Sequence, residues 1–370
     1  MKPQLLITTD CFLPRWDGIA RFLSELFPFL IKHFKVTVIA PRFPGKAPQF
    51  LGVKVIRMPL IPIKFGDIQF ARVNSKIIKE EVEKADLIFN QTIGPIGMKA
   101  IKTAYRQKKP LISYVHNIEW ELCAKAIKFP KRLIWQLIKR TARKHYNKCD
   151  CLIVPSKDVQ SILTANKILT RKIVISLGVD TNKFKPAKSK EKAKKKIGIN
   201  PKNTIIGFAG RIGREKDMPT LIKAFEGLQH KNLKLLIVGT GINLPNTKNM
   251  LKAGATNQVT KYLQAIDIFA HASLTETNSL STMEAMACEL PVVVTPVGSI
   301  KHYVKNNKNG LLFPRHNAEA MQKQLKKLVD SPKLRIELGK KARQTIIKEH
   351  NWKKSAEKIT ELLKNLTLKN

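Results

Sequence analysis

The stretch Thr275–Thr295, TETNSLSTMEAMACELPVVVT, constrains the fold of this chain more than any other segment. Two glutamates, Glu276 and Glu284, stand eight positions apart, and a β-branched run, Val292–Val294, follows them. Such a run is typical of a buried parallel strand, and the apolar spacing before it predicts a short helix. We therefore expect loop, helix, loop and strand, with Glu276 on the first loop and Glu284 within the helix.

A loop that leads into a helix suits an anionic or hydroxylated ligand. Its backbone N–H groups and the positive end of the helix dipole favour a phosphate. A carboxylate at the same place accepts hydrogen bonds from sugar hydroxyls. Ser279 or Ser281 is the expected N-cap of this helix. Two glutamates alone are more often solvated on a helix surface, so the pair is informative only together with its flanks.

The run from Glu276 to Val294 resembles the donor-site signature of the family-4 retaining glycosyltransferases. The resemblance rests on two glutamates with seven residues between them, followed by the sequences Ala-Met-Ala-Cys and Pro-Val-Val. It departs from the family at Glu289, where the family usually has glycine. The resemblance implies the GT-B fold, two Rossmann-like α/β domains facing across a cleft. It also implies transfer of a sugar from a nucleotide diphosphate, with retention at the anomeric carbon.

The chain length favours two domains, because 370 residues exceed an ordinary single domain. We expect an N-terminal, acceptor-side domain over residues 1–180 and a donor-binding domain over 204–349. The lysine-dense segment 181–203 is expected to be a linker that contains a short helix. A helix at about 350–370 is expected to cross back to the first domain, as the resemblance implies.

Short apolar runs predict the strands of the two sheets, with helical segments between them. Open α/β sheets bind ligands at the carboxyl ends of such strands. The predicted strands are Gln4–Thr8, Val36–Ala40, Val53–Met58, Ala85–Asn90, Pro110–His116, Asp150–Pro155, Lys172–Ser176, Ile205–Phe208, Leu233–Gly239 and Ala265–His271.

Two candidate site residues of the first domain follow strands. Gly18 precedes an amphipathic helix, where a glycine either turns the chain or lets a ligand approach the backbone. His116 ends its predicted strand. The resemblance assigns Gly18 to the donor diphosphate and His116 to the donor sugar. The chain has no GxGxxG fingerprint at Gly18, which argues against a nicotinamide enzyme.

Two cations of the second domain, Arg211 and Lys216, lie on the loop after the strand that ends in Phe-Ala-Gly. Cations there neutralise the charge that develops on a leaving diphosphate. They match the Gly-Arg and Glu-Lys of the family, and Gly210 and Gly239 match its nucleotide-side turns. The resemblance assigns the ribose hydroxyls to Glu284.

The same resemblance assigns the hydroxyls of the donor sugar to Glu276. The backbone N–H groups of Asn278, Ser279 and Leu280 are expected to bind there too. The chain has no Asp-x-Asp pair of the kind that holds a metal on the diphosphate, so no metal and no cofactor are expected. Five cysteines without a CxxC pair favour free thiols in a reducing compartment.

The formal net charge is +41, from 68 Lys and Arg against 27 Asp and Glu. This excess favours an anionic partner, although a lysine bias of the whole organism is an equal explanation. Within Lys125–Lys148, a helical face is predicted to carry Ile134, Leu137, Ile138 and Ala142. The candidate membrane-contact residues of this helix are Lys131, Arg132, Trp135, Lys139, Arg140, Arg143 and Lys144.

A basic amphipathic helix with a tryptophan lies well in a lipid interface. The alternative is a domain helix that packs its apolar face on the sheet and leaves its cations solvated. We favour a membrane lipid acceptor, such as a diacylglycerol or a phosphoinositide, with a UDP-glucose or GDP-mannose type of donor. The enzyme is then expected in the cytoplasm, peripheral on the inner face of the cell membrane.

Three alternatives remain open from the sequence. The acceptor could be soluble or a growing polysaccharide. The chain could be a GT-B-fold sugar-nucleotide epimerase or binder, against which the set of two cations and two glutamates argues. Net charge alone would suit a nucleic-acid-binding protein, but no nucleic-acid recognition motif is present. No run of about 18 apolar residues occurs, so no membrane span is expected.

Overall fold

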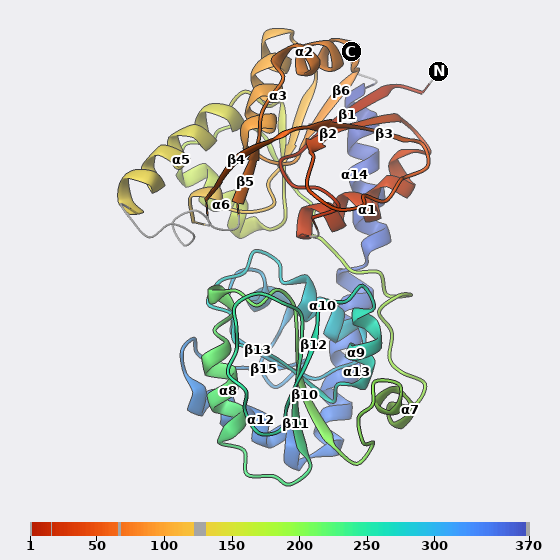
Figure 1. Ribbon diagram of the computed structural model, residues 1–370, viewed down its shortest axis with the longest axis vertical. Coiled ribbons are helices and arrows are strands. Elements are labelled where there is room, and N and C mark those ends of the chain that lie inside the picture. Colours follow the sequence, from red (N-terminus) through yellow and green to blue (C-terminus); the bar gives the residue numbers. More distant parts are fainter. Residues whose placement is uncertain (1, 16, 66–67, 122–130, 368–370) are drawn as a thin grey trace. The chain divides into compact units, whose positions relative to one another are not determined.

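The structure is a computed structural model in which the chain divides into two compact units (Figure 1). The first unit comprises Met1–Ser176 and Ala356–Asn370, and the second comprises Leu177–Ser355. Each unit has a parallel sheet and its own apolar core. The described residues are 2–15, 17–65, 68–121 and 131–367.

Among the described residues, the first unit has a seven-stranded parallel sheet in the order β3-β2-β1-β6-β7-β8-β9. Its central strands are apolar runs buried on both faces, the pattern of a parallel sheet covered by helices. The strands are β1 (Gln4–Thr8), β2 (Lys35–Pro41), β3 (Val53–Met58), β6 (Leu87–Asn90), β7 (Leu111–Tyr114), β8 (Cys151–Val154) and β9 (Lys172–Val174).

Helices of this unit pack on the sheet through a core that includes Ile88, Ala100 and Tyr146. A separate antiparallel pair, β4 (Leu60–Phe65) and β5 (Ile68–Ala71), was not predicted. Apart from the last helix of the chain, the helices described in this unit are α1 (Gly18–Leu30), α2 (Ser75–Lys84), α3 (Pro95–Arg106), α5 (Lys131–Tyr146) and α6 (Lys157–Ala165).

The described part of the second unit has a six-stranded parallel sheet in the order β12-β11-β10-β13-β14-β15. Its strands are β10 (Thr204–Ala209), β11 (Leu233–Val238), β12 (Met250–Gly254), β13 (Ile268–His271), β14 (Val292–Val294) and β15 (Leu311–Leu312). Its helices are α7 (Lys190–Lys195), η1 (Arg214–Lys216), α8 (Met218–Glu226), α9 (Val259–Ala265), α10 (Leu280–Ala287), α11 (Ile300–Tyr303), α12 (Ala318–Asp330) and α13 (Pro332–Glu349).

The strand order of each sheet reverses at one place. In the first sheet, β1 lies between β2 and β6, and in the second, β10 lies between β11 and β13. At such a switch point the two connecting loops leave in opposite directions, which opens a crevice at the carboxyl ends of the strands. The loops after β10 and β13 are the ones that carry Arg211, Lys216 and Glu276.

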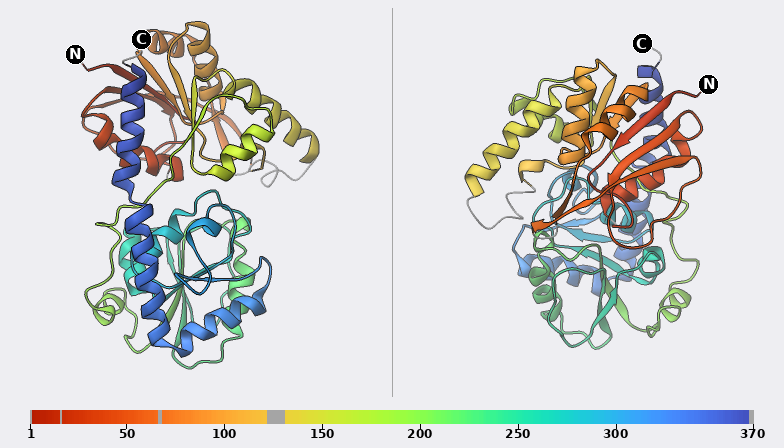
Figure 2. Two further views of the ribbon diagram at one scale, coloured as in Figure 1. Left: turned by 180° about the vertical axis from the view of Figure 1, so that it is seen from behind. Right: turned by 45° about the horizontal axis from the view of Figure 1, so that its top comes forward.

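Residues 181–203, expected to be a linker, belong to the second unit. Helix α7 packs against α9, and the buried Lys194 donates to Asp267 at 2.7 Å from Nζ to Oδ2. The predicted short helix is therefore present, but the segment packs as part of the second unit and is not a free linker. The last helix, α14 (Trp352–Thr367), begins in the second unit and belongs to the first from Ala356 onward (Figure 2).

Candidate active site

The loop after β10 and the loop after β13 meet at the switch point of the second unit. Lys216 ends the short helix η1 and forms an ion pair with Glu276, although 60 positions separate the two residues. The backbone N–H of Leu274 also donates to the Glu215 carbonyl at 2.8 Å. The pair lies mostly buried, with 15% of the Lys216 side chain and 12% of the Glu276 side chain exposed.

Two further residues hold Glu276, and neither was predicted from the sequence. Ser273 donates its hydroxyl to Glu276 Oε1 at 2.9 Å, and His271 Nε2 lies 3.3 Å from the same oxygen. His271 is fully buried, and its Nε2 is 2.7 Å from the Ser273 hydroxyl. Their only signal in the sequence is their place between the end of β13 and Glu276.

The charge of this cluster follows from burial and the ion pair. Burial by itself raises the pKa of the Glu276 carboxyl, but the charge of Lys216 and the hydrogen bonds from Lys216 and Ser273 outweigh it, and the pKa falls below its ordinary value. Burial lowers the pKa of His271 to about 4, so its imidazole is neutral at pH 7. The cluster is therefore a carboxylate held by one ammonium and by neutral donors.

The loops that lead into α10 and α11 carry buried polar groups near Glu276. Asn278 Nδ2 and Ser299 Oγ are both buried, and no described residue is hydrogen-bonded to either atom. The loop of Gly298 lies so close that a Cβ at this glycine would be 1.8 Å from the Glu276 carbonyl oxygen. Because buried polar groups normally have partners, the two atoms are ready to bind a polar ligand.

Helix α10 contains Glu284, as predicted, and departs from the expected geometry in one detail. Ser279 is its N-cap residue, but its hydroxyl makes no capping bond and lies 2.8 Å from the Thr282 hydroxyl. Glu284 is 3% exposed on this helix. Glu289, where the family usually has glycine, has φ +64°, so the turn keeps the left-handed conformation that favours glycine.

The two predicted glycines of the nucleotide side are in contact. Gly239 has φ +135°, and a Cβ there would lie 1.9 Å from the Gly210 carbonyl oxygen. Only glycine fits that close approach. The packing of the two loops therefore requires a glycine at position 239, in addition to its predicted place in the nucleotide-side turn. Arg211 follows on this loop and pairs with Glu215, with 62% of the arginine side chain exposed.

In the first unit, Gly18 and His116 lie after β1 and after β7. Gly18 is the first residue of α1, and a Cβ added there would meet no atom within 4 Å. Asp17 caps this helix by accepting from the backbone N–H groups of Ile19 and Ala20, so these two amides already have a partner. β7 ends at Tyr114, two residues before the position expected from the sequence, and His116 Nε2 lies 2.9 Å from Gln91 Oε1.

Helix α5 packs differently from the prediction. Ala142 is buried, and Trp135 and Ile138 contact the core of the first unit. Leu137, expected on the apolar face, is 63% exposed, and Leu133 is 67% exposed. The helix therefore has an outer face on which two leucines lie among cations.

The exposed cations of this outer face are Arg132, Arg140, Arg143 and Lys144. Lys139 is less exposed, with its Nζ 4.6 Å from the centre of the Trp135 ring. The side chain of Lys131 lies outside the described residues. Among the helices that the structure describes, none is both long enough and apolar enough to cross a lipid bilayer.

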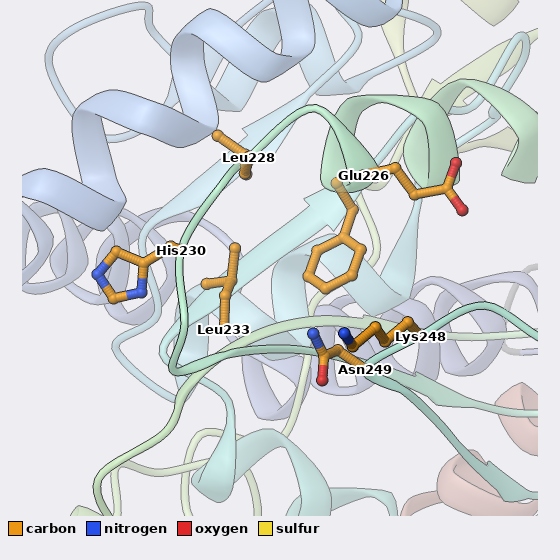
Figure 3. Close-up of a pocket in the computed structure, with 7 residues that line it drawn as sticks. Glu226, Leu228, His230, Leu233, Lys248 and Asn249 are labelled. Atoms are coloured by element: carbon orange, nitrogen blue, oxygen red, sulfur yellow. The ribbon is translucent and has the colours of Figure 1, made fainter.

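Two pockets of the second unit differ in their position on the sheet. The pocket in Figure 3 has a volume of about 200 Å³ and is lined by residues such as Phe225, His230 and Leu233. It lies at the start of β11, away from the carboxyl ends of the strands. A pocket of about 510 Å³ is lined by Thr275 and Gly298 among others, beside Glu276. The larger pocket is therefore formed by neighbours of Glu276, whereas Lys216 and Glu276 themselves are not among its lining residues.

Comparison with known proteins gives two family models in succession along the chain. "Glycosyltransferase Family 4" matches residues 16–183, and "Glycosyl transferases group 1" matches residues 189–345. An uncharacterised glycosyltransferase of Methanocaldococcus jannaschii is 26% identical, with 99% of each chain covered. Alpha-monoglucosyldiacylglycerol synthase of Acholeplasma laidlawii is 25% identical, covering 91% of this chain and 90% of that protein.

The fold also matches solved structures. The crystal structure of Anabaena HepE in complex with UDP and glucose has a TM-score of 0.78 to this chain, at 18% identity. It covers 98% of this chain and 99% of that one. The two parallel sheets with their helices are thus those of the GT-B fold, as the sequence predicted.

Proposed function

Because the chain belongs to the family-4 glycosyltransferases, whose two domain models match it in succession, we propose that it moves a hexose from a nucleotide-diphosphate sugar to an acceptor with retention at the anomeric carbon. The observation that carries this proposal is the Lys216–Glu276 pair at the switch point of the second sheet. At the place where such a sheet binds ligands, the pair provides an ammonium that can bind phosphate and a carboxylate that can accept hydrogen bonds from sugar hydroxyls. HepE, of the same fold, was crystallised with UDP and glucose.

Each predicted residue of the second unit has a role in this proposal. Arg211 and Lys216 neutralise the diphosphate, and the loop of Gly210 and Gly239 supports the nucleotide. Glu276 accepts hydrogen bonds from the sugar hydroxyls, and Glu284 accepts them from the ribose. The backbone N–H groups of Asn278, Ser279 and Leu280 donate to the same ligand.

In the first unit, Gly18 lets the diphosphate approach the backbone, and His116 contacts the sugar. For the chemical step we propose attack by the acceptor hydroxyl oxygen from the face that the diphosphate leaves. The bond between the anomeric carbon and the phosphate oxygen breaks, and its electron pair stays on that oxygen. The same phosphate oxygen takes the proton of the acceptor hydroxyl. Arg211 and Lys216 stabilise the charge that develops on the leaving group.

We propose that this step needs no resident metal. Among the described residues, no group of three or more His, Cys, Asp or Glu is arranged to hold a metal ion. The two cations supply the positive charge that a metal provides in other glycosyltransferases.

A donor panel tests the proposed function. Purified protein is mixed with UDP-glucose, UDP-galactose, UDP-N-acetylglucosamine or GDP-mannose, with and without membrane lipids, and nucleoside diphosphate release is measured with and without EDTA. We expect release from one donor, dependent on an acceptor and unaffected by EDTA. Conversion of a donor to an epimer without diphosphate release would show an epimerase instead. Absence of both release and donor binding would overturn the proposal.

For the acceptor we propose a membrane lipid, with the outer face of α5 on the anionic surface of the bilayer. The support is the pair of exposed leucines, Leu133 and Leu137, among the exposed cations of this helix. Apolar side chains insert into the lipid interface while the cations meet the headgroups. The Acholeplasma laidlawii relative is named a monoglucosyldiacylglycerol synthase, which agrees with a lipid acceptor. The enzyme would then act on the inner face of the cell membrane.

Replacing Arg132, Arg140, Arg143 and Lys144 together by glutamine should lower binding to anionic vesicles by about 10²- to 10³-fold. Each basic residue near an anionic surface contributes about 1 kcal/mol, and about 1.4 kcal/mol is a tenfold change. Flotation with vesicles of phosphatidylglycerol and phosphatidylcholine measures the loss.

The matched control removes the same charge from exposed lysines of the second unit, namely Lys323, Lys326, Lys327 and Lys333. Equal loss in both variants would show that net charge, and not α5, binds the vesicles. Unchanged binding in the α5 variant would exclude this helix as the membrane contact. A donor that reacts only with a soluble glycan would favour the alternative acceptor.

A further inference from the structure

The imidazole of His116 is held by three side chains from three different segments. Its ring stacks on Tyr114 of β7, with 4.3 Å between centroids and 29° between planes. Phe22 of α1 meets the ring edge-on at 4.9 Å between centroids. Gln91, which follows β6, provides the polar contact, with 2.9 Å between its Oε1 and His116 Nε2. The ring therefore has a fixed plane and a fixed orientation.

The side-chain amide of Gln91 is itself oriented by the backbone. Gln91 is 1% exposed, and its Nε2 donates to the Phe89 carbonyl at 3.3 Å. Its backbone N–H donates to the Thr8 carbonyl at 2.8 Å, which fixes the residue on the sheet. A flipped amide would bring its oxygen against the Phe89 carbonyl oxygen. The amide oxygen must therefore face the ring, and the Nε2 of His116 must carry a hydrogen to donate.

The ring carries this hydrogen without a charge. Burial lowers the pKa of His116 to about 3. The groups that face it are the Gln91 amide, the apolar Phe22 ring and Tyr114, whose phenol pKa is raised by burial. A neutral imidazole with hydrogen on Nε2 has a lone pair on Nδ1. Among the described residues, the structure shows no hydrogen-bond partner for that Nδ1 atom.

We propose that Gln91 is a positioning residue that fixes His116 as the Nε2–H tautomer, so that its Nδ1 accepts a hydrogen bond from a hydroxyl of the transferred sugar. This inference rests on the proposed function, in which His116 contacts the donor sugar. It adds that the histidine is the hydrogen-bond acceptor in its contact with the sugar. It also adds that Gln91, which touches no substrate, fixes the tautomer that can accept. The contact is then independent of pH across the neutral range, because the ring does not take up a proton there.

The first measurement is the tautomer itself, in the wild-type protein. Protein labelled with ¹⁵N-histidine is examined by NMR between pH 5.5 and 9, and the His116 signals are assigned by their loss in His116→Gln. We expect hydrogen on Nε2, none on Nδ1, and no titration in this range. Hydrogen on Nδ1, or a midpoint near pH 6.5, would overturn the inference.

The second measurement uses Gln91→Glu and Gln91→Met. The introduced carboxylate favours a protonated ring, so the pKa of His116 rises and a hydrogen appears on Nδ1 as the pH falls. Transfer by Gln91→Glu should therefore be near the wild-type rate at pH 8.5 and about tenfold lower at pH 6. Gln91→Met, which leaves the tautomer free, should lose activity by a similar factor at every pH.

The outcomes separate the inference from the proposed function. Absence of transfer by the wild-type protein would contradict the proposed function, and the tautomer measurement would still test the role of Gln91. If the wild-type protein is active and His116 titrates in Gln91→Glu while the pH profile stays flat, the inference fails. A purely structural role of Gln91 predicts equal losses of transfer activity in both variants, with no additional loss at low pH in Gln91→Glu.

Discussion

Glu276→Gln should lower the rate of sugar transfer by about 10²- to 10³-fold while the protein stays folded. The carboxylate forms charge-assisted hydrogen bonds with hydroxyls, which are about twice as strong as neutral ones. Glutamine keeps the shape and can still accept from the Ser273 hydroxyl, so the loss reports the charge. Measuring kcat and kcat/KM with the donor identified by the panel gives the size of the effect.

Stability needs a separate control, because the substitution leaves Lys216 without its partner. We expect a loss of about 2 kcal/mol in the free energy of unfolding, a fraction of the total for a domain. The double variant Glu276→Gln with Lys216→Met removes both charges, so its melting temperature should recover while its activity does not. Glu226→Gln, an exposed residue at the end of α8, is the matched control for one lost charge. Full activity of Glu276→Gln would contradict the role of this carboxylate.

Arg211→Gln should lower kcat by about 10²-fold with little effect on stability. The guanidinium can bind two phosphate oxygens at once, and a glutamine amide has neither the charge nor the fork of donors. Because 62% of this side chain is exposed, its ion pair with Glu215 contributes little to folding. Steady-state kinetics of donor consumption, compared with thermal melting, separates the two effects.

Arg214→Gln is the matched control, since Arg214 is exposed on the adjacent turn η1. Its activity should stay close to that of the wild type. An equal loss in both variants would point to a general effect of positive charge around the loop. A loss of melting temperature in Arg211→Gln that parallels the loss of kcat would instead assign the arginine to structure.

Much of the fold follows from local patterns of the sequence. The apolar run Ile205–Phe208 predicts β10, and Val292–Val294 predicts β14, because a parallel strand buried on both faces needs a continuous apolar run. The short helix between Glu276 and Pro291 was predicted with its apolar side chains buried, and Met283 and Met286 are buried. The pair β4–β5 was missed, since it has no clear period in the sequence. For the segment 181–203 the short helix was predicted, but its packing in the second unit was not.

The face of α5 shows why periodicity alone is insufficient. The spacing places Leu137 with Ile138 and Ala142, but the helix turns Ile138 and Ala142 toward the core and leaves Leu137 outside. A leucine at helical spacing lowers the free energy only if a neighbouring element covers it. That neighbour is decided by the packing of α5 on the sheet, which no local pattern specifies.

The sequence by itself determined the two α/β units, the family and the residue types of the site. Only the tertiary structure decided which of those residues touch. The strand order puts β10 beside β13, so Lys216 meets Glu276, and β6 beside β7, so Gln91 meets His116. Local propensity acts over a few residues, whereas these contacts depend on which strands pair across long intervening segments. The free energy that selects one pairing comes from the burial of the whole sheet, and the site residues acquire their partners as a consequence.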